Sequence, residues 1–186
     1  MTDVAYWDDG IVVGAVANVC VTIWRKHVTR ERFDEQARGL ADVIRRYPRR
    51  AGFVCVIESG VAPPEEHMRR AATDMLKGHE STLAAVAGVI EGTGFRSALT
   101  RSVLVGFQFV HPRFSVPVKL FATVPAAMRW LRDRECVADA DAGTVGVEEM
   151  RKMMDAREQQ TTSRASTDSG VAFRSVAESL RVSARR

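Results

Sequence analysis

Apolar runs and amphipathic stretches alternate along the first 134 residues of this chain. Four segments are apolar, contain β-branched residues and are bounded by turn signals, and they predict strands: Ile11–Trp24, Ala51–Ile57, Thr82–Ile90 and Pro117–Thr123. A short segment at Val4–Trp7 precedes them, and the Asp-Asp-Gly turn that follows it predicts a hairpin.

The segments between these strands carry apolar residues at helical spacing. Thr29 has the side chain of a helix N-cap, and the apolar positions after it recur every three or four residues until Pro48. A pair of prolines followed by two acids starts a second helix, which ends at Gly78. A third helix is expected after Gly94, and a fourth contains Trp130.

This alternation predicts the order β-β-α-β-α-β-α-β-α. Strands that alternate with helices form a partly parallel sheet, because each crossover returns the chain to the same edge. The first two strands are close enough in sequence to pair as an antiparallel hairpin. We therefore expect an α/β fold with a mixed, mostly parallel sheet flanked by helices.

The composition changes near residue 137 and suggests two regions. We expect an α/β domain over residues 1–136 and a polar, basic tail over residues 137–186, largely disordered with short helices. The 36 residues from Arg151 to Arg186 hold eight basic and four acidic side chains, whereas the first 150 residues hold 19 of each. The net charge of +4 thus comes from the tail, and we do not expect the domain to bind nucleic acid.

Other features exclude several classes of protein. A membrane-spanning helix requires about 18 consecutive apolar residues without a charge, and the sequence contains no such run. The N-terminal segment carries acids where a signal peptide has basic residues, so we expect a cytoplasmic protein. The three cysteines and four histidines show no metal-ligand spacing, and we expect neither a metal nor a cofactor.

Two loops that follow strands carry candidate binding residues. The first is Glu58-Ser59-Gly60, where Ser59 is either part of a turn or an exposed hydroxyl that can be phosphorylated. The second contains Thr93 and Gly94. Its N–H groups either form a tight turn or hold an anion or a partner group, with two nearby arginines as further contacts: Arg96 and Arg101. Neither loop matches a catalytic or nucleotide-binding motif.

Three stretches resemble STAS domains, the anti-sigma-factor antagonist fold, and their bacterial SpoIIAA-like relatives. These are the loop ESGVAPP, the segment AAVAGVIEGTGFRSALTRSVL and the closing VKLFATVPAAMRWL, and the resemblance covers roughly Val4 to Arg134. In the antagonists, a serine at the start of a helix is the phosphorylation switch, and the resemblance assigns this place to Ser59. This chain departs from the Asp-Ser-Ser-Gly-Leu pattern, because Glu58 replaces the aspartate and one serine is missing.

The resemblance implies a non-enzymatic regulatory module that binds a protein partner under the control of serine phosphorylation. The alternative is a domain that binds a small ligand or lipid, because related α/β folds hold apolar ligands beneath a helix. An enzyme that uses Ser59 is a third hypothesis, although no nucleophile elbow supports it. The sequence leaves open the partner, the ligand and the oligomeric state.

Overall fold

The computed structural model describes residues 2–92 and 115–159 of the 186-residue chain. One sheet of six strands forms its centre, and the strands lie in the order β1-β2-β3-β4-β5-β6. The strands are β1 (Thr2–Trp7), β2 (Ile11–Val16), β3 (Val19–Trp24), β4 (Ala51–Ile57), β5 (Leu83–Ile90) and β6 (Val118–Phe121). The first three strands pair antiparallel and the last four pair parallel, so the expected α/β class with a mixed, mostly parallel sheet is confirmed.

The segment Ile11–Trp24, expected as one strand, contains two strands joined by a tight turn. Val16 pairs with Val19, and Ala17 takes a left-handed conformation with φ of 54°. The chain therefore reverses at Ala17 and Asn18, and β2 and β3 form a hairpin. The expected order was wrong at this point. The helix expected after Gly94 falls on residues that the structure does not describe.

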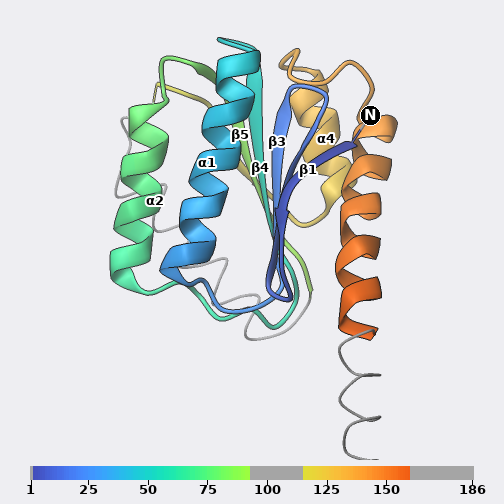
Figure 1. The fold of residues 1–186 in the computed structure, drawn as a ribbon. Coiled ribbons are helices and arrows are strands. Elements are labelled where there is room, and N and C mark those ends of the chain that lie inside the picture. The colour runs from blue at the N-terminus through green and yellow to red at the C-terminus, as the bar shows by residue number, and fades with distance from the viewer. Residues whose placement is uncertain (1, 93–114, 160–186) are drawn as a thin grey trace, which may run out of the picture.

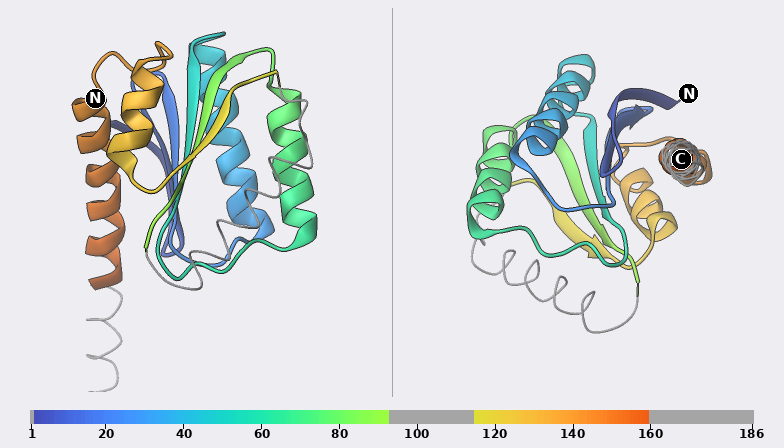
Figure 2. Two further views of the ribbon diagram at one scale, coloured as in Figure 1. Left: turned by 180° about the vertical axis from the view of Figure 1, so that it is seen from behind. Right: turned by 60° about the horizontal axis from the view of Figure 1, so that its bottom comes forward.

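Four helices cover the sheet in the described part of the chain. They are α1 (Arg30–Arg46), α2 (Glu66–Gly78), α4 (Val124–Arg132) and a C-terminal helix that begins at residue 140 and is described to residue 159. Helices α1 and α2 pack on one face, and α4 and the C-terminal helix pack on the other (Figures 1 and 2). None of these described helices is long and apolar enough to cross a membrane.

Helix α1 forms where the sequence predicts it. The Thr29 hydroxyl accepts a hydrogen bond from the backbone N–H of Arg32, which satisfies one of the free donors of the first turn. Gly39 lets the helix approach the sheet closely, because a Cβ atom at this position would lie 2.4 Å from a methyl carbon of Val13. Helix α2 begins later than expected, at Glu66, and the two prolines before it lie in the loop.

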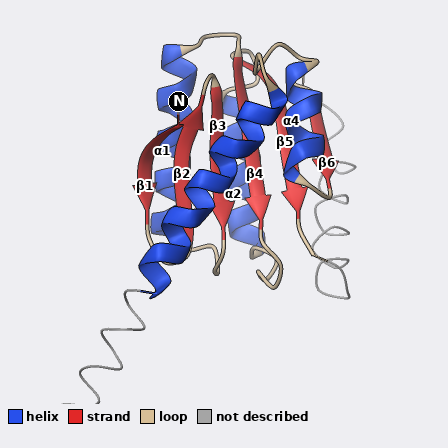
Figure 3. Ribbon diagram, turned by 90° about the vertical axis from the view of Figure 1, so that its right-hand side faces the viewer, coloured by secondary structure: helices blue, strands red, loops and turns tan. Residues whose placement is uncertain are grey.

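The folded part of the chain extends beyond the boundary that we expected at residue 136. Val147, Met150 and Met154 are buried and belong to the core that also contains Val16 of β2. Their spacing of three and four residues places them on one side of the C-terminal helix, which crosses in front of β2 and β3 (Figure 3). Residues 137–159 are therefore part of the domain and not of a tail.

Two methionines of the C-terminal helix test this packing directly. We expect Met150→Ala to lower the free energy of unfolding by about 2–5 kcal/mol, because it leaves a cavity against Gly14. Met153→Ala makes the same change at a side chain that is 38% exposed, and we expect an effect within about 0.5 kcal/mol. Urea denaturation measures both, and equal effects would show that the helix does not pack on the sheet.

Candidate functional site

The parallel strands β3, β4 and β5 end at the same level. Trp24 pairs with Ile57, and Ile57 pairs with Ile90. The ladder continues one residue further, because the backbone N–H of Glu58 donates to the carbonyl of Trp24 and that of Glu91 donates to the carbonyl of Ile57, at 2.9 and 3.0 Å. This edge, at the bottom of Figure 1, brings together two sets of side chains on opposite faces of the sheet.

An ion-pair network occupies the face that carries the C-terminal helix. Arg25 donates two hydrogen bonds to the carboxylate of Glu58, at 2.7 and 3.1 Å. Arg25 also lies 2.7 Å from a carboxylate oxygen of Asp155. The side chains of Arg25 and Glu58 are only 15% and 16% exposed, and the hydrogen bonds that Arg25 donates to Glu58 raise the pKa of Arg25 above its ordinary value. This geometry holds the guanidinium charged and fixed.

Arg151 of the C-terminal helix extends the network. Its Nη2 donates to Glu91 at 3.0 Å, and its Nε lies 3.4 Å from Glu58. The Nε contact lacks hydrogen-bond geometry, so it is an electrostatic contact and the buried Nε–H has no hydrogen-bond acceptor among the described residues. Through Arg25 and Arg151, the C-terminal helix is attached to the ends of β3, β4 and β5.

The three residues expected at the first loop have different environments. Glu58 is fixed in the ion-pair network, whereas Ser59 and Gly60 are exposed. Gly60 has φ of 92°, a left-handed conformation that glycine adopts at little cost, so the chain turns here. Six residues separate Ser59 from Glu66, where α2 begins, so the hydroxyl is not at a helix N-terminus as the STAS pattern implies.

The second expected loop is not part of the described structure. Thr93, Gly94, Arg96 and Arg101 all fall in residues 93–114. Their role as an anion or partner contact stays a prediction.

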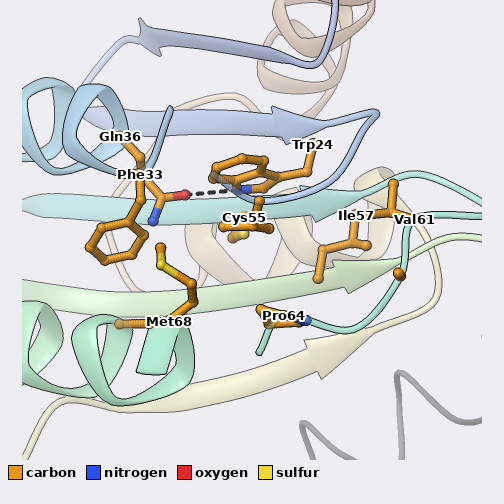
Figure 4. Close-up of a pocket in the computed structure, with 11 residues that line it drawn as sticks. Trp24, Phe33, Gln36, Cys55, Ile57, Val61, Pro64 and Met68 are labelled. Carbon is orange, nitrogen blue, oxygen red and sulfur yellow. Dashed lines mark hydrogen bonds between the residues drawn. The ribbon is translucent and has the colours of Figure 1, made fainter. Parts of the chain in front are cut away.

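An apolar pocket lies on the opposite face of the same edge, between α1, α2 and the sheet. It has a volume of about 110 Å³, and the segment after Ser59 forms part of its wall. Ten of the lining side chains offer carbon or sulfur surface: Trp24, Val28, Phe33, Cys55, Ile57, Val61, Ala62, Pro64, Met68 and Ala72. Figure 4 shows labelled members of this set around the open space.

Gln36 is the one side chain with a polar amide in this wall. It is 4% exposed, and its Oε1 accepts a hydrogen bond of 2.9 Å from the indole Nε1 of Trp24. We did not identify the pocket from the sequence. A signal was present, because Gln36 interrupts the apolar stripe of α1 between Phe33 and Leu40.

Cys55 is half-buried and lies in the wall of the pocket. Burial raises the pKa of this thiol to about 12, and a hydrogen bond with Trp24 offsets the effect only in part. Cys55 is therefore a neutral thiol at physiological pH. Within residues 2–92 and 115–159, no three His, Cys, Asp or Glu side chains are grouped as a metal site requires.

Comparison of the chain with protein-family models, curated proteins and solved structures gave no match. The site must therefore be interpreted from its own geometry.

A double-mutant cycle on Arg25 and Glu58 tests the ion-pair network. With Arg25→Gln, Glu58→Gln and the double variant, we expect a coupling free energy of about 1–3 kcal/mol, because the bonds are charge-assisted and shielded from water. The matched control is the exposed pair Arg30–Asp34 on α1, for which about 0.3–0.5 kcal/mol is expected. Similar coupling in both cycles, measured by urea denaturation, would contradict the network.

Proposed function

We propose that this protein is a non-enzymatic binding module that takes up a small, largely apolar ligand in the pocket between α1 and α2. The observation that carries the proposal is an open cavity of about 110 Å³ whose wall contains no charged side chain. Ligand sites in proteins are typically concave and apolar, with a few polar groups that orient the ligand. The pocket has this composition.

Energetics favour an occupant for this space. The pocket is open at the surface and its wall is almost entirely apolar, so a ligand that covers this wall removes apolar area from water and adds dispersion contacts. A dry apolar cavity of ~150 Å³ is large enough to bind benzene, so a group of roughly one ring suits the present volume.

The chemistry of the wall supports binding over catalysis. Nucleophilic cysteines react as thiolates, which need a lowered pKa. Burial instead raises the pKa of Cys55 to about 12. The other polar group, the amide of Gln36, does not titrate.

Filling the pocket tests the proposal. Ala72 lines the pocket, and its neighbour Ala71 on α2 does not, so Ala72→Phe and Ala71→Phe form a matched pair. We expect native mass spectrometry of the protein from its own cells to show a bound small molecule in the wild type and in Ala71→Phe. Ala72→Phe should lose it, because the ring occupies the same space. A wild-type protein without a ligand, or equal retention in Ala72→Phe, would contradict the proposal.

A second candidate function is a STAS-like module that binds a protein partner through the loop at Ser59. The favouring observation is that the loop is fixed on its inner side and open at its tip. Glu58 is held by Arg25, and Val61 is buried in the pocket wall. A Cβ atom added to Gly60 would meet no other described residue within 4 Å, so within the described part of the chain the tip is open to a partner.

This loop can also accept a negative charge at Ser59. The neighbouring carboxylate of Glu58 would repel a phosphate, and Arg25 and Arg151 reduce this repulsion only in part because they also pair with Asp155 and Glu91. No helix N-terminus adjoins Ser59 among the described residues, so the exposure of the loop tip to water is what allows it to carry a phosphate.

The two substitutions at Ser59 test this candidate function. We expect Ser59→Asp and Ser59→Ala to keep the wild-type melting temperature, because the side chain is exposed. Ser59→Asp should weaken or strengthen binding to a partner isolated from the native cell, whereas Ser59→Ala should bind as the unphosphorylated wild type does. Phosphosite mapping on the native protein accompanies the binding measurement. If the wild type and both variants bind the partner equally and no phosphate is found on Ser59, this candidate function is wrong and Ser59 is only a turn residue.

A further inference from the structure

The amide of Gln36 is held in one orientation. An indole N–H only donates hydrogen bonds, so the group that faces Trp24 must be the amide oxygen. The Nε2 group, which carries two N–H donors, is then the part of the amide that is turned away from Trp24. Figure 4 shows this nitrogen pointing across the cavity toward Met68.

The Nε2 donors face the pocket. No hydrogen bond from this nitrogen to another described residue is present, although the side chain is only 4% exposed. The nitrogen is not one of the buried atoms without a partner in the described part of the chain, so it is accessible from the cavity. A ligand that brings an acceptor into the cavity would satisfy the donor.

The rest of the wall excludes a charged group at this depth. None of the 11 lining side chains is charged, so an ion in the pocket would lose its hydration without gaining a counter-ion. The wall also offers no carboxylate or carboxamide oxygen for a donor-rich ligand, because Oε1 of Gln36 already accepts from Trp24.

We propose that the pocket selects neutral ligands that carry a hydrogen-bond acceptor, such as a ketone, ester or ether oxygen, on an apolar body of about one ring. Gln36 is the residue that binds this oxygen, and Trp24 positions Gln36. The inference rests on the proposed ligand-binding function and names the class of its ligand.

Two probes of nearly equal shape separate this inference from simple apolar binding. Cyclohexanone and methylenecyclohexane differ only in an oxygen that replaces a CH₂ group, and both match the cavity in size. Cyclohexylammonium adds a charge to the same ring. Binding to the full chain is followed through the methyl signals of Val61, a residue of the pocket wall, in ¹H–¹³C NMR spectra.

The measured quantity is the ratio of the dissociation constants of methylenecyclohexane and cyclohexanone. We expect Gln36→Leu to lower this ratio about fivefold relative to the wild type, because one net hydrogen bond is lost. The double variant Trp24→Phe/Gln36→Leu removes both partners of the buried bond and should show the same change, which keeps the test valid if the single variant does not fold. Ile57→Leu alters the wall on the side away from the amide (Figure 4), and its ratio should stay within about twofold of the wild type.

The outcomes separate the two proposals. If both neutral probes bind the wild type and the ratio is the same in the Gln36 variants, the role of Gln36 is wrong while the ligand pocket stands. If cyclohexylammonium binds as tightly as cyclohexanone, the selection for neutral ligands is wrong. If neither neutral probe binds the wild type, the ligand-binding function itself is wrong.

Discussion

The common level at which β3, β4 and β5 end is the constraint on which both features of this edge depend. Side chains alternate between the two faces of a strand, so consecutive residues at a strand end face opposite sides. Trp24 and Ile57 therefore face α1 and α2 and line the pocket, while the next residues, Arg25 and Glu58, form ion pairs with the C-terminal helix. A shift of one strand by one residue would disrupt the pocket and the network together.

The two faces are chemically different, and each suits its role. The ion pairs of Arg25 and Arg151 join the last described helix to the centre of the sheet, so the main role of the network is structural. The pocket, in contrast, offers an apolar wall and one N–H donor group without an acceptor among the described residues, which a ligand can cover and bond. The loop at Ser59 connects the two, because Glu58 belongs to the network and Val61 to the pocket wall.

Local patterns in the sequence predicted most of the described elements, and the errors have physical causes. The strand Ala51–Ile57 and the cap at Thr29 were predicted correctly, because β-branched runs and capping side chains act locally. The turn at Ala17 lies inside an apolar run without glycine or proline beside it, and Asn18 is the local signal for a break there, which was too weak to divide the run into two strands. The C-terminal helix is highly charged and has few apolar residues. The burial of its methionines could not be predicted from local sequence, because it depends on the packing of the helix against one face of the sheet. The pocket depends on how two helices pack, although Gln36 on an apolar stripe was a detectable signal.

A crystal structure of the protein purified from its own cells tests the central claim most directly, since it shows what fills the space between α1 and α2. We predict density for a small molecule in the pocket, with an acceptor atom ~2.7–3.2 Å from Nε2 of Gln36 and the amide oxygen still bonded to Trp24. A cavity that is filled by side chains of this chain, or that holds only water beside Gln36, would contradict the account.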